Sequence, residues 1–148
     1  MENRYRHTVF MVKTTDNKRP PQWLALHFQH LAMDQYAHNH GQQEQDVPHA
    51  ISEKSAGRQC VIDHNQVAGL AGIHIGMPVT VAHGFVDSLQ ISVRNRQAEQ
   101  AGLERLAAWC YQYSSQVCIA RQRNSLLLEI AASRRLFGDA EAIARRIQ

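Results

Sequence analysis

The stretch "WLALHFQHLAMD", Trp23 to Asp34, decides where the fold begins. It starts as a short apolar run behind a pair of prolines, which is the pattern of a central strand. From Leu31 the spacing allows a helical turn or two. His27 and His30 lie where the apolar run should end, so this place is a metal site, a catalytic pair, or a site that has lost its original residues.

Length and composition limit the possible classes of protein. The 148 residues suit one domain, or a small domain that carries a subdomain. Residues 1–21 are polar and end in the paired prolines, so we expect a flexible leader. No run of about 18 apolar residues occurs, which predicts a soluble, cytoplasmic protein without a membrane span.

Cysteine usage and charge agree with an intracellular setting. Cys60, Cys110 and Cys118 are an odd number without a close-spaced pair, which is typical of reduced thiols. The formal net charge is +3, and most of the basic residues are arginines, which suit phosphate contact. DNA is therefore a reasonable partner, although a solvated basic face explains such an excess more often.

The middle of the chain combines a hairpin with a short helix. The runs "PHAISE" and "RQCVID" are joined by "KSAG", which predicts a β-hairpin with Gly57 at a positive φ. We expect a short helix in "NQVAGLAGI", opened by an Asn65 cap, and a loop in "HNHGQQEQD" before the hairpin. Residues 79–93 give no clear pattern.

The C-terminal part alternates helix, strands and helix. A helix is expected over about Arg94 to Tyr113, where Leu103, Leu106 and Cys110 form an apolar stripe and Glu99 falls outside it. The runs "QVCIAR" and "SLLLEIA" predict two strands, and Asp139 is the expected cap of a last helix. The order of elements predicts an α+β fold, with a sheet of at least three strands and helices on one face.

The histidines are candidate metal ligands. Zinc needs three or four converging ligands, whereas His27 and His30 are three residues apart and His38 and His40 two apart. Residues three apart share no face of a strand, so the first pair converges only if the chain turns helical. The sequence contains no HExxH and no CxxC motif. A histidine-based metal-binding enzyme remains one alternative, and an interaction module unrelated to DNA is another.

Several segments, taken in order, resemble the N-terminal palm and fingers of Y-family translesion DNA polymerases. The closer likeness is to the ImuB branch, the polymerase-like accessory protein of damage-induced (SOS) mutagenesis. The segments are "QWLALHFQHLAMD", "PHAISEKSAGRQCVIDHNQ", "AGIHIGMPV", "LERLAAWCYQYSSQV" and "NSLLLEIAASRRLFG". The resemblance implies a partial palm with an inserted fingers subdomain: leader 1–21, first palm strand 22–34, fingers-like insert 35–91, and palm helix and hairpin 92–148, without the remaining palm, thumb and C-terminal DNA-binding domain.

The resemblance also implies where polymerase chemistry would lie. Active members hold two metal ions with carboxylates from the first palm strand and a later palm hairpin. Here His27 and Gln29 stand at the first pair of positions, and Asn124 and Ser125 stand at the second. Glu129 matches a later acidic position that is not a metal ligand in the family.

The nucleotide-binding positions differ as well. The Tyr and Arg of the family's fingers motif fall on Gln66 and Gly69. We therefore expect a pseudoenzyme with no catalytic residues, no metal and no cofactor; residual polymerase activity is the alternative.

The implied role is that of a scaffold in DNA repair and translesion mutagenesis. The branch bridges a sliding clamp, a recombinase-like accessory protein and an error-prone replicative-type polymerase, mostly through regions that this chain lacks. The candidate DNA contacts are Arg121, Arg123, Arg134 and Arg135, and a solvated basic surface explains them equally well. Missing palm strands would leave an open sheet edge, through which the chain could self-associate.

Overall fold

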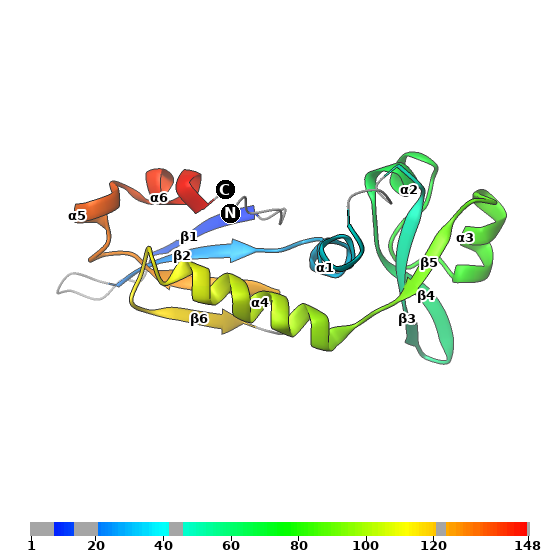
Figure 1. The fold of residues 1–148 in the computed structure, drawn as a ribbon, viewed down its shortest axis with the longest axis horizontal. Coiled ribbons are helices and arrows are strands. Elements are labelled where there is room, and N and C mark those ends of the chain that lie inside the picture. Colours follow the sequence, from blue (N-terminus) through cyan, green and yellow to red (C-terminus); the bar gives the residue numbers. More distant parts are fainter. Residues whose placement is uncertain (1–7, 14–20, 42–45, 121–123, 148) are drawn as a thin grey trace. The chain divides into compact units, whose positions relative to one another are not determined.

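The computed structural model describes residues 8–13, 21–41, 46–120 and 124–147. These residues form an α+β fold with two small sheets and six helices (Figure 1). The chain divides into two compact units: unit 1 comprises residues 1–29 and 100–148, and unit 2 comprises residues 30–99. Unit 2 is wider than the expected insert over 35–91, because it also includes residues 30–34 and 92–99.

The sheet of unit 1 has four strands, each antiparallel to its neighbours. In spatial order they are β1 (Thr8–Lys13), β2 (Gln22–His27), β7 (Ser125–Glu129) and β6 (Val117–Ala120). Strand β2 pairs with β7, which is 98 residues away at the His27–Ser125 pair. The sequence-distant pairing of the apolar strand with the later hairpin is confirmed.

Strand β1 contradicts the expectation of a flexible leader over residues 8–13. It pairs along its whole length with β2, from Thr8 opposite His27 to Lys13 opposite Gln22. The physical reason is that a strand in the interior of a sheet needs backbone partners on both sides. The outer strands of this sheet are therefore β1 and β6, and self-association through a sheet edge stays a prediction about those two strands.

Burial alternates along the two central strands. Leu24, Leu26, Leu126 and Leu128 are almost fully buried, whereas the intervening Leu127 is only partly buried. This alternation is typical of a sheet that is covered by helices on one face, as predicted. The helices that carry residues of unit 1 are α4 (Arg96–Cys110), α5 (Arg134–Phe137) and α6 (Ala140–Ile147).

Helix α6 has the cap and the buried face that its sequence predicts. The Asp139 carboxylate accepts a hydrogen bond from the backbone N–H of Ala142 at 2.8 Å, which satisfies one of the free donors at a helix start. Ile143 and Ile147, one turn apart, are buried. Helix α4 is shorter than the expected helix over Arg94 to Tyr113, because it begins at Arg96 and ends at Cys110.

The sheet of unit 2 has three strands in the order β4, β3, β5. Strands β3 (His49–Ser55) and β4 (Arg58–His64) form the predicted hairpin, and Gly57 has the expected positive φ of 80°. Strand β5 (Gln90–Val93) runs parallel to β3. Residues 79–93 gave no clear pattern because a short parallel strand depends on a non-local partner.

Three helices complete unit 2. Helix α1 (Leu31–His40) runs further than predicted, so the expected loop begins after His40. Helices α2 (Gln66–Leu70) and α3 (Val79–Phe85) share an apolar core with the sheet. That core contains Ala50, Val61, Ala68, Ile73, Met77, Ala82 and Leu89.

A bulge in β4 gives neighbouring residues different roles. Val61 lies opposite Ser52, and Asp63 lies opposite Ile51, so Ile62 is one residue in excess. An extra residue reverses the alternation of side chains along a strand. Val61 therefore faces the α2–α3 core, while Asp63 lies on the other face and contacts α1.

Two further features of the fold are the state of the cysteines and the length of the helices. The three cysteines are free thiols, as expected. Cys110 is buried on α4, and burial raises the pKa of its thiol to about 12, which disfavours the reactive thiolate. Within the described residues no helix is long and apolar enough to cross a bilayer.

Candidate functional site

The end of β2 and the start of β7 lie side by side in unit 1. His27 is directly opposite Ser125, and the His27 Nδ1 atom lies 3.0 Å from the Ser125 hydroxyl oxygen. One residue further, the backbone N–H of Phe28 donates to the carbonyl of Asn124 at 2.9 Å. The structure therefore brings together the two places in the sequence at which the family resemblance expects metal-binding carboxylates.

The side chains at this site are an imidazole, two carboxamides and a hydroxyl, so none is a carboxylate. Asn124 has a φ of 46°, a left-handed conformation that asparagine tolerates better than most residues. Gln29 is exposed to solvent. Magnesium-type ions prefer anionic oxygen ligands, and none of His27, Gln29, Asn124 and Ser125 supplies one. What this site forms is a cross-strand hydrogen bond between an imidazole and a hydroxyl.

Glu129 lies at the opposite end of β7, where it has a backbone role. It is opposite Trp23, about 13 Å along the strand from Ser125 at the usual rise per residue. Its Oε1 atom accepts hydrogen bonds from the backbone N–H groups of Gln22 at 3.1 Å and Ala131 at 3.0 Å. This carboxylate holds the end of the β2–β7 pair and does not reach the His27 site.

The nucleotide-binding positions of the resemblance lie on α2. Gln66 is exposed, and the Asn65 carboxamide caps the helix by accepting from the N–H of Ala68 at 2.9 Å, as predicted. The ring of His64 fills the space above Gly69: a Cβ atom there would lie 2.8 Å from His64 Cε1. The N–H at His64 Nδ1 donates to the carbonyl of Asn65 at 3.0 Å. A larger side chain at position 69 would have to displace this ring.

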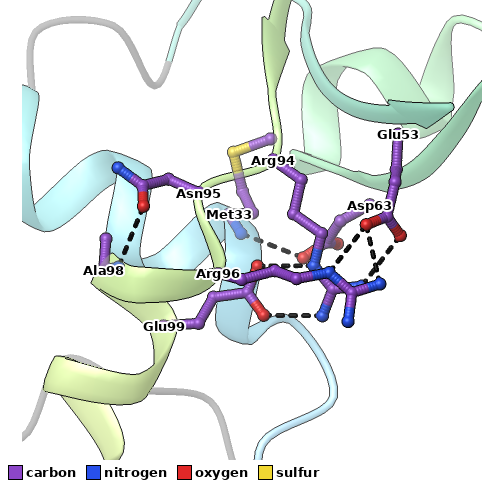
Figure 2. A network of polar contacts seen from close by, with 8 residues as sticks. All are labelled: Met33, Glu53, Asp63, Arg94, Asn95, Arg96, Ala98 and Glu99. Carbon is purple, nitrogen blue, oxygen red and sulfur yellow. Dashed lines mark hydrogen bonds and ion pairs between the residues drawn. The ribbon is translucent and has the colours of Figure 1, made fainter.

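Asp63 is a buried carboxylate whose role the sequence did not reveal. Its Oδ2 atom accepts from the backbone N–H of Met33 at 3.0 Å (Figure 2), and its Oδ1 atom lies 2.7 Å from His30 Nδ1. A carboxylate at a helix start satisfies free N–H donors and interacts favourably with the helix dipole. Asp63 thereby ties the end of β4 to the start of α1. The only sign of it in the sequence is an acidic residue at the end of an apolar strand.

A second polar network joins β3 to the start of α4 (Figure 2). The Arg94 guanidinium donates to both carboxylate oxygens of Glu99, at 2.7 and 2.6 Å, and to Glu53 at 3.1 Å. Arg96 donates to the other oxygen of Glu53 at 2.8 Å. Hydrogen bonding to Glu99 raises the pKa of Arg94, and hydrogen bonding to Arg96 lowers the pKa of Glu53.

Glu99 corrects one sequence expectation. It was expected outside the buried stripe of the helix, yet it is 5% exposed. It can be buried because the bidentate contact with Arg94 compensates its charge, which is the usual condition for an acidic residue inside a protein. Asn95, between Arg94 and Arg96, caps α4 by accepting from the N–H of Ala98 at 3.0 Å.

The histidines considered as metal ligands have separate partners. His27 is bonded to Ser125 in unit 1, His30 to Asp63 in unit 2, and His40 to the carbonyl of Tyr36 at 2.9 Å. In the part of the chain that the structure describes, no group of three or more His, Cys, Asp or Glu side chains could hold a metal ion.

Two of the four candidate DNA contacts can be located. Arg121 and Arg123 lie outside the described residues. Arg134 and Arg135 open α5, where the Arg134 guanidinium donates to the side-chain oxygen of Gln22 at 3.0 Å and Arg135 is exposed.

The fold and the two strand ends define a class of protein: a polymerase-type palm with a second small unit inserted after β2, the second strand of its sheet. Three solved structures share this fold with the chain, each over 84% of the chain. They are a post-insertion binary complex of Dbh DNA polymerase (TM-score 0.71, 17% identity), an insertion ternary complex of Dbh DNA polymerase (0.69, 16%) and DinB from Sulfolobus solfataricus (0.61, 17%). The chain spans only 36–37% of their length. The palm and fingers region of a Y-family polymerase is therefore the fold of this chain.

Residues 32–148 match the model of the impB/mucB/samB family. The chain belongs to this family. No curated protein sequence matches it.

Proposed function

We propose that this chain is a non-catalytic Y-family polymerase-like domain of the ImuB type, which acts in DNA-damage tolerance through contacts with proteins. The observation that carries the proposal is the His27–Ser125 hydrogen bond at the two strand ends. Two-metal phosphoryl transfer needs carboxylates there, whereas these two side chains are an imidazole and a hydroxyl that bond to each other. The His64 ring above Gly69 supports the same conclusion for the nucleotide-binding cation.

Primer extension tests the proposal. We expect the purified protein to incorporate no nucleotide with magnesium or manganese, because none of His27, Gln29, Asn124 and Ser125 offers an anionic oxygen to either ion. An active Y-family polymerase is the positive control. Robust, template-dependent incorporation by this protein would overturn the proposal.

A restored variant sharpens this experiment. The fourfold change His27→Asp, Gln29→Asp, Asn124→Asp and Ser125→Glu places carboxylates at all four positions. We expect the variant to bind magnesium measurably by calorimetry while the native chain does not, since like-charged carboxylates at one place favour a cation between them. Equal magnesium binding by both proteins would contradict the proposed loss.

The proposed partners are those of the ImuB branch: an error-prone replicative-type polymerase, a recombinase-like accessory protein and a sliding clamp. Mixing each purified partner with the chain on a size-exclusion column tests which of them this region binds. We expect the chain to co-elute with at least one of these partners. Co-elution with none of them would contradict the proposal that this region binds them.

Weak DNA contact is the second part of the proposal, and Arg134 and Arg135 are its described candidates. We expect low affinity that falls steeply with salt, as for phosphate contacts by arginine. The Arg134→Ala and Arg135→Ala double variant should reduce the salt dependence by about two counterions. The Arg145→Ala variant is a matched control, because Arg145 pairs with Glu141 on its own helix.

A further inference from the structure

Charge is distributed very unevenly between the two units. Residues 30–99 contain seven Asp and Glu against four Lys and Arg, a formal net charge of −3. The residues of unit 1 contain six Asp and Glu against twelve Lys and Arg, a formal net charge of +6. The two net charges add to the +3 of the whole chain. Binding to a phosphate backbone depends on cations that release counterions. Unit 2 by itself therefore has the wrong charge for nucleic acid.

Two of the four Lys and Arg residues of unit 2 are held in ion pairs. Arg94 and Arg96 are held by Glu53 and Glu99 in the network of Figure 2. Lys54 and Arg58 lie at the tip of the β3–β4 hairpin. Between residues 59 and 93 the sequence contains no Lys or Arg at all, and this stretch includes the whole of α2 and α3.

The α2–α3 stretch instead exposes large apolar side chains. Leu70 is 83% and Phe85 62% exposed, and Val81 is exposed as well. Val81 and Phe85 are one turn apart on α3, so they share a face. The Phe85 ring lies against Gly72, 3.5 Å from where a Cβ atom would stand, which brings it to the turn that follows Leu70. We call Leu70, Val81 and Phe85 the α2–α3 surface.

The side chains of this surface are not members of the apolar core of unit 2. That core takes Ala68 from α2 and Ala82 from α3, both fully buried. Solvated helices of a monomer usually show polar residues on the outward face. Clustered, exposed apolar side chains are typical of a protein interface.

We infer that the α2–α3 surface is a docking site for an apolar, Lys- or Arg-flanked helical segment of a partner protein. The apolar side chains would pack on Leu70, Val81 and Phe85, and the flanking cations would complement Asp87, which follows α3, and the net negative charge of unit 2. The inference deepens the proposed function, because it assumes that the chain acts through protein contacts. It assigns those contacts to unit 2 and leaves phosphate contact to unit 1.

The test uses backbone NMR spectra of the whole chain and three probes. They are an amphipathic helical peptide of Leu and Lys, its counterpart of Leu and Glu, and a short DNA duplex. We expect the Leu–Lys peptide to shift the amide signals of α2 and α3. We expect the Leu–Glu peptide to bind more weakly and the duplex to leave these signals in place.

Variants decide whether the α2–α3 surface is the site. The Leu70→Ser and Phe85→Ser double variant should bind the Leu–Lys peptide about tenfold more weakly, as for a loss of interface anchors. Both residues are exposed, so the variant should keep its native spectrum elsewhere. Leu136→Ser is the matched control, since Leu136 is an exposed leucine of unit 1, and it should leave binding unchanged.

Three outcomes would overturn the inference: perturbation of α2 and α3 by the DNA duplex, equal binding of the two peptides, or unchanged binding by the double variant. Self-association of the chain that the double variant abolishes would also overturn it, in favour of a second copy as the occupant. Primer extension is independent of this result. Nucleotide incorporation together with peptide binding would refute the proposed function and leave the docking site standing.

Discussion

The two units use carboxylates in opposite ways. In unit 1 the strand ends that face each other carry His27 and Ser125, and the carboxylate of Glu129 holds backbone at the far end of β7. Unit 2 wholly or partly buries several acidic residues, among them the three carboxylates of Asp63, Glu53 and Glu99. Each of these three has a donor within hydrogen-bond distance.

The comparison teaches that the two places depend on carboxylates to different degrees. A cross-strand pair tolerates any two side chains that fit and bond, so the strand pairing at His27 and Ser125 needs no carboxylate. A carboxylate that caps a helix or pairs with a buried arginine has no substitute of the same geometry. We therefore expect substitutions of the carboxylates of unit 2 to cost more stability than substitutions at His27 and Ser125 in unit 1.

The largest effect is expected for Asp63→Ala. This substitution removes the buried carboxylate that bonds to the Met33 N–H and to the His30 ring. It should lower the free energy of unfolding by about 3 kcal/mol. Urea denaturation measures this change. Asp87→Ala, an exposed aspartate of the same unit, is the control and should change stability by less than about 0.5 kcal/mol. A similar cost for both variants would show that burial of Asp63 is not what matters.

Arg94→Ala is expected to cost about 2 to 3 kcal/mol, because it leaves the buried Glu99 without its bidentate partner. The control is Arg96→Ala, since the Arg96 side chain is 72% exposed and an exposed ion pair contributes under about 1 kcal/mol. Equal effects of the two variants in urea denaturation would mean that Glu99 is reached by water once Arg94 is absent.

Gly69→Ala tests the occupied space on α2. Alanine favours a helix over glycine by about 1 kcal/mol, but its Cβ would collide with the His64 ring, and overpacking costs about 1 to 3 kcal/mol. We expect a net loss of about 1 kcal/mol. The second change His64→Ala should remove the loss and expose the gain from helix propensity. A stabilising Gly69→Ala on its own would show that His64 moves freely.

Ser125→Ala is expected to have a small effect in unit 1. It removes one partly buried hydrogen bond, so the loss of stability should be about 1 kcal/mol or less. Ser114→Ala is a useful comparison in the same unit, because the Ser114 hydroxyl donates to the carbonyl of Glu129 at 2.6 Å. A loss at Ser125 that exceeds the loss at Asp63 would break the comparison between the units.

The smallest effect is a pH dependence that arises from Glu53. Its folded-state pKa is lowered from the ordinary value of 4.5, first by the hydrogen bond from Arg96. The stability that Glu53 contributes is therefore present above the unfolded pKa and is lost as the pH falls through the lower folded pKa. Unfolding free energies measured between neutral and acidic pH should show a shallower acid loss for Arg96→Ala than for the native chain. An unchanged slope would argue against the Arg96–Glu53 contact in solution.

Local pattern was sufficient for much of the fold. Several elements follow from local preferences of the backbone. They are the apolar run at Trp23, the turn at Gly57, the caps at Asn65 and Asp139, and the stripe of Leu103, Leu106 and Cys110. The strands within residues 8–13 and 79–93 were not predicted, because each of them forms only by pairing with a strand that is distant in the sequence. Of the sites, the resemblance located His27 and Ser125, and the structure showed that they are bonded to each other.

By itself, the sequence determined which side chains stand at the strand ends and on α2, and therefore that no carboxylate is available at those places. Only the tertiary structure decided what the remaining charges do. Asp63 bonds to the start of α1, which is 30 residues away in the sequence, and Arg94 bonds to Glu53, which is 41 residues away. The reason is physical: a charge acquires its role from the partner that burial brings to it, and no sequence spacing states which partner that is.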